Sequence, residues 1–296
     1  MRYASTAIAL SAAKPRTVLA TLAVNVNTVV PMDVMISELW GHLRPRSAKA
    51  VIQTYILQLR KHIATVLGGR VDDPDRVAKQ LVATRPGGYV LNADDACVDM
   101  QNFDRLAMAG HRERELGDLQ AASRNFSEAL SWWQGRPLLD VQTGLSLDSH
   151  VRRLEESRLN VLDRRIEVDL RLGRHYELLG ELTALVGQYQ THEGLCAHLM
   201  LALYRSGRRS EALDVYRRVR TRMVEDLALE PSPALRRLHR SMLVSDRSSG
   251  SLTDDWQAVS TTSGAYRSLP GPRQGTIPVE LAAASWRAQP EAMSAD

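Results

Sequence analysis

The sequence predicts a mainly α-helical protein: a winged helix-turn-helix domain followed by an α-helical tetratricopeptide-like domain. Two amphipathic segments joined by a short break at 31–63 predict the helix-turn-helix. A hairpin pattern at 81–91 predicts the wing, and glycine-centred helix pairs predict the second domain. The expected division is a winged-helix domain at 1–93, a helical domain at 97–244 and a disordered tail at 245–296.

The first helix of the pair is expected to begin at Pro31, because a proline at the first helical position loses no intrahelical hydrogen bond. From Met32 to Leu39, apolar residues recur at positions i, i+3, i+4 and i+7 and form one apolar face. Gly41 favours a C-terminal cap, so the helix is expected to end at Trp40. A shorter amphipathic helix is expected before it, at about 15–26.

The second helix, expected over 47–63, has two different sides when residues advance by about 100° each. Its apolar side carries Ile52, Tyr55, Ile56, Leu59 and Ile63. Its opposite side carries hydroxyl, amide and ammonium groups, which can hydrogen-bond base edges or phosphates. An ordinary solvated helix face is the alternative interpretation. Such a helix pair, with its second helix in the major groove, is typical of sequence-specific DNA binding.

The hairpin consists of strand-like runs at 81–84 and 89–91 around Arg85-Pro86-Gly87-Gly88, where glycine supplies the positive φ that a tight turn needs. Arg85 is expected near the wing tip, where it can contact a minor groove or a phosphate. A plain surface arginine is the alternative. The predicted DNA-binding residues are Arg46, Ser47, Lys49, Thr54, Gln58, Arg60, Lys61 and Arg85, with Lys49 and Arg60 reaching phosphates from the flank of the helix.

Charge separates the two halves of the chain. Residues 1–93 hold 12 Lys and Arg and 5 Asp and Glu, a net charge of +7, whereas the whole chain is +4. The basic excess therefore lies with the predicted DNA-binding domain, where phosphate attraction would give salt-dependent affinity. RNA binding is disfavoured, because Trp40, Tyr55 and Tyr89 are expected to be core residues and cannot form a stacking platform.

The helical segment contains three similar stretches centred on Gly117, Gly173 and Gly207. Gly173 and Gly207 are 34 residues apart, which is the tetratricopeptide period, and the glycine closes the first helix of such a repeat. A loop at 134–138 interrupts the period. Stacked helix pairs present a concave surface that usually binds protein segments, so a helical-repeat adaptor without specific DNA binding is the alternative function. A helical scaffold with no ligand is also open.

Composition and motifs disfavour other classes of protein. Cys97 and Cys196 are the only cysteines, which suits a reducing cytosol, and no apolar run reaches the roughly 18 residues of a spanning helix. We expect a cytoplasmic, nucleoid-associated protein without membrane contact. No phosphate-binding G-x-x-x-x-G-K-[ST] loop is present, and 144–148 misses the nucleophile-elbow pattern. His198 would point away from His192 and Cys196, so no metal, cofactor or enzymatic activity is expected.

Several long motifs, in the correct order, resemble the Streptomyces antibiotic regulatory protein family, whose members pair an OmpR-type winged helix with a bacterial transcriptional activation domain. The similar stretches are Lys14-Pro15-Arg16, SELWG at 37–41, QTYILQLRKHI at 53–63, ATRPGGYVLN at 83–92, and the helical segments 117–140, 152–175 and 199–243. No receiver domain is seen, so phosphorylation control of the two-component type is not expected.

The resemblance implies an activator of an antibiotic or secondary-metabolite gene cluster. It would bind promoter direct repeats as a dimer on double-stranded DNA and recruit RNA polymerase holoenzyme. It also implies that Thr54, Gln58 and Lys61 face the bases and that Arg85 contacts DNA from the wing. Gln58 departs from the family, where arginine is commoner, and glutamine prefers adenine over guanine. Pro15 replaces a usual glutamine, and only Thr6–Leu10 is expected to remain of a longer N-terminal sheet. Either the start site is set too late or the sheet is truncated, and a truncated sheet would uncover apolar surface on the helices.

Overall fold

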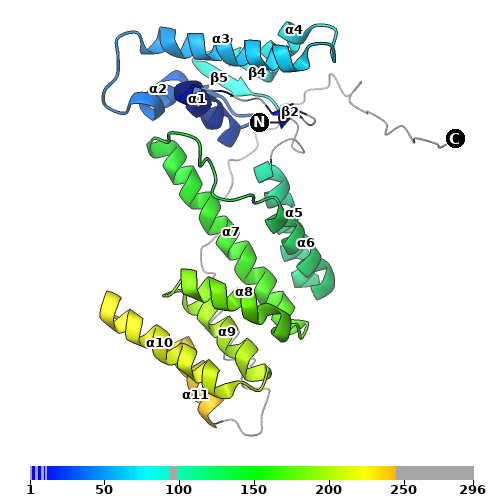
Figure 1. Ribbon diagram of the computed structural model, residues 1–296. Helices are drawn as coiled ribbons and strands as arrows, with labels where there is room; N and C mark the ends of the chain where they lie inside the picture. The colour runs from blue at the N-terminus through cyan, green and yellow to red at the C-terminus, as the bar shows by residue number, and fades with distance from the viewer. Residues whose placement is uncertain (1, 4–5, 8–9, 11, 94–98, 245–296) are drawn as a thin grey trace, which may run out of the picture. The chain divides into compact units, whose positions relative to one another are not determined.

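The computed structural model describes residues 2–3, 6–7, 10, 12–93 and 99–244 (Figure 1). Four helices and five short strands are described up to Leu91, and the described residues from Asp99 to Val244 form helices and loops only. A winged helix-turn-helix followed by tetratricopeptide-like helix pairs is therefore the observed fold, as the sequence predicted. The predicted disorder of the tail at 245–296 concerns residues outside the described part of the chain.

The N-terminal segment forms a hairpin and a helix. Strand β1 (Arg2–Tyr3) pairs antiparallel with β2 (Thr6–Ala7), so strand structure is not limited to the predicted Thr6–Leu10. Helix α1 (Ala13–Val24) begins two residues before the predicted start at 15. Pro15 lies in the first turn of α1, where its missing N–H group leaves no intrahelical hydrogen bond unmade.

The helix-turn-helix consists of α2 (Met32–Trp40) and α3 (Ala48–Leu67). Helix α2 ends where predicted, and Gly41 after it adopts a φ of +54°. Pro31 is the N-cap residue of α2 and not its first helical residue, because it also belongs to strand β3 (Val30–Pro31). Helix α3 extends four residues beyond the predicted end at 63, since Leu67 continues its buried face one turn further.

Helix α4 (Pro74–Leu81) was not predicted. Its start has a clear local signal: the Asp73 side chain accepts a hydrogen bond of 2.9 Å from the N–H of Arg76, and Pro74 follows at the first helical position. An aspartate followed by proline is a recognisable helix start, so attention to capping residues would have found this helix.

The wing is formed by β4 (Val82–Arg85) and β5 (Gly88–Leu91), which pair antiparallel as predicted. Strand β3 pairs with the other edge of β5, giving the order β3-β5-β4. Gly87 supplies the positive φ of the turn, at +79°. Gly88 has a different role from the predicted one: a Cβ atom there would lie 2.1 Å from the Val30 carbonyl oxygen, so glycine allows β3 and β5 to pair.

A single apolar cluster holds the winged helix together. It contains residues of α1, α2, α3, α4 and the wing, the elements labelled in the upper part of Figure 1. Tyr89 is buried in this cluster, and Trp40 and Tyr55 pack against it partly buried, which confirms them as core residues. The largest fully buried side chains of this part are Leu22, Met35, Ile36, Ile52, Ile56, Leu59 and Leu67.

Three helix pairs follow, and in each pair a glycine lies in the turn between the two helices. The pairs are α5 (Asp99–Leu116) with α6 (Leu119–Ser131), α7 (Leu145–Arg171) with α8 (His175–Gln188), and α9 (Glu193–Arg205) with α10 (Arg209–Leu227); helix α11 (Pro233–Val244) comes last. Gly117, Gly173 and Gly207 have φ values of +86°, +82° and +76°, which confirms the predicted role of each glycine between two helices. The predicted interruption is the loop between α6 and α7.

Helix α7 contributes buried carboxylates to the packing of the helical pairs. Asp163 is hydrogen-bonded to His198 of α9, with 2.9 Å between Oδ1 and Nε2, and both side chains are buried. Asp169 accepts hydrogen bonds from Ser123 (2.7 Å) and Arg174 (2.8 Å). Because a buried charge is costly unless it is paired, these contacts fix the register of α7 against its neighbours.

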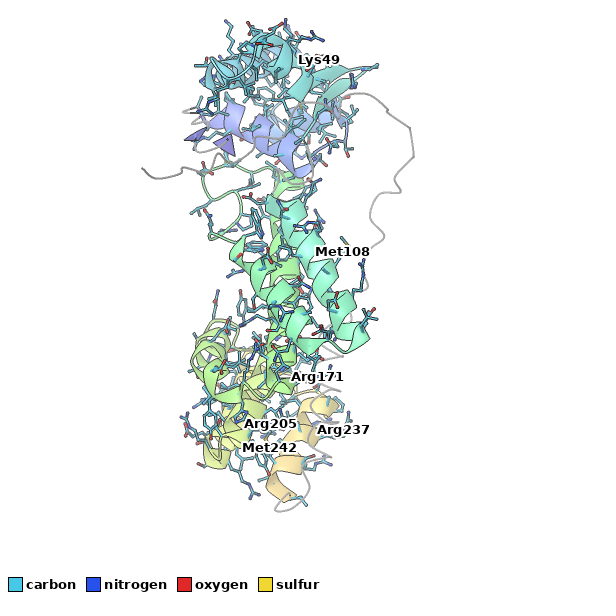
Figure 2. All side chains as sticks on the ribbon, turned by 90° about the vertical axis from the view of Figure 1, so that its right-hand side faces the viewer. Lys49, Met108, Arg171, Arg205, Arg237 and Met242 are labelled. Atoms are coloured by element: carbon cyan, nitrogen blue, oxygen red, sulfur yellow. The ribbon has the colours of Figure 1, made fainter. Side chains whose placement is uncertain are left out.

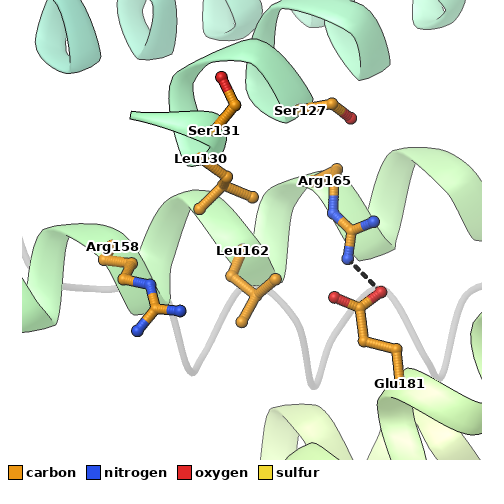
Figure 3. A pocket seen from close by; sticks show the side chains of 7 residues that line it. All are labelled: Ser127, Leu130, Ser131, Arg158, Leu162, Arg165 and Glu181. Atoms are coloured by element: carbon orange, nitrogen blue, oxygen red, sulfur yellow. Dashed lines mark hydrogen bonds and ion pairs between the residues drawn. The ribbon is translucent and has the colours of Figure 1, made fainter. Parts of the chain in front are cut away.

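A surface hollow of about 310 Å³ lies between α6, α7 and α8. Figure 3 shows its lining, in which Arg165 of α7 points toward Glu181 of α8 and forms an ion pair with it at 2.5 Å. The lining residues are Ser127, Leu130, Ser131, Arg158, Leu162, Arg165 and Glu181. Arg165 forms ion pairs with Asp169 of α7 and Glu181 of α8. Its guanidinium group therefore links α7 to α8.

Candidate nucleic-acid interface

Helix α3 has the two sides that the sequence predicted. Ile52, Ile56, Leu59 and Ile63 are buried in the core of the winged helix, each with at most 3% of its surface exposed. Thr54, Gln58 and Lys61 of the opposite side are exposed to solvent, and Lys49 on the flank is exposed as well. The helix contains no aspartate or glutamate, so its exposed side combines cationic and neutral polar groups without an opposing charge.

The N-terminal end of α3 is open to an anion. Ser47 is the N-cap residue, and its hydroxyl makes no capping hydrogen bond. Arg46 and Ser47 are both exposed in the turn that precedes the helix. Because a helix N-terminus carries unpaired N–H groups and a partial positive charge, these groups suit a phosphate. Lys49, in the first turn of α3, is also exposed and is labelled in Figure 2.

Thr54 and Gln58 lie one helical turn apart on the exposed side of α3. The Thr54 hydroxyl donates a hydrogen bond of 3.0 Å to the Ala50 carbonyl oxygen, which fixes its orientation along the helix. Its two acceptor lone pairs remain for another donor. The side chain of Gln58 is exposed and offers both a donor and an acceptor, as recognition of an adenine edge requires.

Arg60 differs from the expectation that it reaches a phosphate from the flank of α3. Its Nε and Nη2 donate hydrogen bonds of 2.8 and 2.6 Å to the Val82 carbonyl oxygen, and Nη2 also donates to the Thr84 hydroxyl at 2.9 Å. The guanidinium therefore ties α3 to strand β4. Arg60 positions the wing relative to the helix, and the sequence contained no signal for this contact because the main acceptor is a backbone carbonyl.

Arg85 lies at the end of β4, directly opposite Gly88 across the wing turn. Residues 84–87 are all exposed, so the tip of the wing projects into solvent. No ion pair of Arg85 is found within the residues that the structure describes. The structure thus gives the wing one exposed cation near its tip and connects the wing to α3 through Arg60.

Two residues of this region were missed by the sequence analysis. Leu57 lies on the exposed side of α3 with 53% of its surface accessible. The same 100° rule that placed Thr54 and Lys61 also places Leu57 on that side, so the signal was present. Glu38 of α2 is buried, with 7% of its surface accessible, and accepts hydrogen bonds from the backbone at the start of α7.

The residues considered for metal binding have other roles. His192 accepts a hydrogen bond from the Leu195 N–H and caps α9, and His198 is bonded to Asp163. Cys196 is buried, and burial raises the pKa of its thiol to about 12. In the described part of the chain, no group of three His, Cys, Asp or Glu residues could hold a metal ion. None of the described helices combines the length and apolar character needed to cross a membrane.

Comparison with known proteins identifies the family. The model of the bacterial transcriptional activator domain matches residues 98–243. Regulatory protein DnrI of Streptomyces peucetius is 45% identical over 241 residues, which make up 81% of this chain and 88% of DnrI. The chain belongs to the Streptomyces antibiotic regulatory protein family. Transcriptional regulator RedD of Streptomyces coelicolor, a further relative, is 33% identical over 237 residues, or 80% of this chain and 66% of RedD.

Family members also share the fold. The structure of Mycobacterium tuberculosis EmbR in complex with a low affinity phosphopeptide superposes with a TM-score of 0.75 at 31% sequence identity. The superposition covers 87% of this chain and 64% of the EmbR chain. The predicted family and fold class are therefore confirmed. Membership in the Streptomyces antibiotic regulatory protein family makes the chain a regulator of transcription.

Proposed function

We propose that this protein is a sequence-specific DNA-binding activator of transcription, specific for the promoters of an antibiotic or other secondary-metabolite gene cluster. The observation that carries the proposal is the exposed side of α3, which presents hydroxyl, amide and ammonium groups and no carboxylate. Groups of these kinds recognise base edges in the major groove, and the cations among them add phosphate attraction.

In the proposed complex, α3 enters the major groove and Thr54, Gln58 and Lys61 face base edges. Arg46, Ser47 and Lys49 contact phosphates at the start of the helix, where the dipole favours an anion. Arg85 contacts an adjacent groove or phosphate from the wing tip. Arg60 acts through the wing that it positions, since its guanidinium is bonded to Val82 and Thr84.

The remaining elements of the proposal come from the family. Two protomers would bind promoter direct repeats side by side, and the complex would recruit RNA polymerase holoenzyme. We assign DNA recognition to residues 1–93 and attribute activation to residues 97–244, whose paired helices suit the binding of protein segments. Such a regulator acts in the cytoplasm on the nucleoid.

The test is a binding titration on duplexes that carry direct repeats from the neighbouring gene cluster, at two salt concentrations and against a scrambled duplex. Tight binding that falls with salt and is lost on the scrambled duplex supports the proposal. Equal, weak binding to both duplexes contradicts it and favours a helical-repeat adaptor that binds proteins.

Lys61→Ala sharpens this test. If Lys61 contacts a base, the variant weakens binding by roughly 1–3 kcal/mol, and if it contacts a phosphate, it reduces the salt slope by about one. Lys79→Ala is the matched control, because Lys79 is an exposed lysine on α4, outside the proposed interface. Unchanged affinity and slope for Lys61→Ala would remove Lys61 from the interface.

A further inference from the structure

An apolar side chain lies beside Thr54 and Lys61 on the exposed side of α3. Leu57 exposes 53% of its surface, whereas every other leucine and isoleucine of this helix exposes less than 4%. Single exposed apolar side chains are common on protein surfaces, so the exposure of Leu57 alone does not indicate a function. What distinguishes Leu57 is its position among the residues that are proposed to contact bases.

The geometry of α3 places Leu57 between these residues. Thr54 is three residues before it and Lys61 is four residues after it, which are the spacings of direct neighbours on a helix surface. Gln58 follows Leu57 in the sequence and is also exposed. At about 100° per residue, Leu57 falls between Thr54 and the Lys49 flank, on the part of the exposed side that also carries Lys61. A groove that receives Thr54, Gln58 and Lys61 must therefore also receive Leu57.

The major groove offers one apolar partner to such a side chain. Thymine alone among the four bases carries a methyl group there, at C5, while adenine, guanine and cytosine present hydrogen-bond donors and acceptors. A leucine pressed against a donor or acceptor would remove it from water without replacing its hydrogen bond, which is unfavourable. A leucine against the thymine methyl buries apolar surface on both sides.

We propose that Leu57 is a specificity-determining residue that selects thymine in the operator through contact with its C5-methyl group. This inference rests on the proposed function and adds a base preference to it: the half-site contains a thymine next to the base pairs that Gln58 and Lys61 contact. Helix α3 thus combines hydrogen-bond recognition at Gln58 with apolar recognition at Leu57.

The experiment removes the methyl group from the DNA and leaves the protein intact. Each thymine of a bound half-site is replaced in turn by deoxyuridine, which differs only by the missing C5-methyl group. At the thymine that Leu57 contacts, the affinity of the unaltered protein should fall about fourfold, the loss expected for one buried methyl group. No loss at any thymine overturns the inference.

The protein variant assigns that loss to Leu57. Leu57→Ala should bind the thymine duplex more weakly and should no longer distinguish it from the deoxyuridine duplex at that position. Leu116→Ala, the truncation of a 74% exposed leucine at the end of α5, is the matched control and should keep the full fourfold difference. If Leu57→Ala also keeps the fourfold difference in affinity between the two duplexes, another residue contacts the methyl group and the inference is wrong.

The same data separate this inference from the proposed function. Specific, salt-dependent binding without any deoxyuridine effect overturns only the role of Leu57. Absence of specific binding to every duplex overturns the proposed function and the role of Leu57 together. An unchanged unfolding midpoint of Leu57→Ala, expected for a half-exposed side chain, shows that the comparison concerns folded proteins.

Discussion

Glu38 caps helix α7 at Gly144. The carboxylate of Glu38, in helix α2, accepts hydrogen bonds from the backbone N–H groups of Gly144 (2.6 Å), Ser146 (3.0 Å) and Leu147 (3.2 Å). Gly144 is the N-cap residue of α7 and has no side chain to satisfy these donors, so a residue 106 positions earlier does so. The helix dipole adds to the attraction, because it favours a negative charge at the N-terminus.

We expect Glu38→Ala to lower the free energy of unfolding by about 1.5–3 kcal/mol, since three N–H groups at the start of α7 lose a charged acceptor. Glu38→Gln, which keeps one acceptor oxygen but no charge, should lose less. Chemical denaturation of the full chain measures both effects. Glu156→Ala, which truncates an exposed glutamate on the same helix α7, should change stability by less than about 0.5 kcal/mol. Equal stability of Glu38→Ala and Glu156→Ala would show that the cap contributes nothing.

Arg60→Lys tests whether the guanidinium holds the wing. The substitution keeps the positive charge but cannot reproduce the two hydrogen bonds to Val82 together with the one to Thr84. We expect a loss of about 1–2 kcal/mol in the free energy of unfolding. A residue that only contacted phosphate would tolerate the change in the absence of DNA. Lys61→Ala provides the comparison, because Lys61 is exposed and its truncation should leave stability unchanged.

Two glycines within helices should respond in opposite directions to alanine. A Cβ atom at Gly110 of α5 would lie 2.6 Å from the ring of Phe126, a fully buried residue of α6. Overpacking of this kind costs roughly 1–3 kcal/mol and should exceed the helix-propensity gain of about 1 kcal/mol. Gly180 of α8 has no atom near its Cβ position, so Gly180→Ala should stabilise by about 0.5–1 kcal/mol. Thermal unfolding of the two variants measures the contrast, and stabilisation by both would mean that Phe126 moves freely.

Acid should destabilise the helical pairs through His111. Burial, followed by the nearby Arg114 and Arg164 cations, lowers the pKa of His111 below its usual 6.5. The unfolded chain therefore binds a proton at this position more readily than the folded protein does. The stabilisation is complete above pH 6.5 and is lost as the pH falls through the lower pKa of the folded state.

The measurement is the unfolding midpoint between pH 7.5 and pH 5.5, expected to decrease with acid. His111→Gln should show a smaller decrease, because one of the contributing groups is gone. Some decrease should remain, since the pKa values of His150 and His239 are also lowered, in each case mainly by burial. Identical pH dependence of both proteins would show that His111 does not contribute.

Short-range patterns made much of the fold accessible from the sequence. The apolar spacing of Met32 to Leu39 and of Ile52 to Ile63 predicted α2 and α3 because a helix repeats every 3.6 residues. Gly173 and Gly207 predicted the boundaries within helix pairs, since a positive φ favours glycine. Exposed positions on α3 followed from the same periodicity. Boundaries were less accurate, as the longer α3 and the unpredicted α4 show.

The tertiary structure alone decided which distant groups meet. Arg60 bonds a carbonyl oxygen 22 residues away, Glu38 caps a helix more than 100 residues away, and Gly88 makes room for the backbone of Val30. In each case the partner is a backbone group, which every residue carries, so no side-chain pattern marks it. The sequence by itself determined the elements, the family resemblance and the polar side of α3. Only the folded chain determined that charged residues such as Arg60 and Glu38 hold distant elements together.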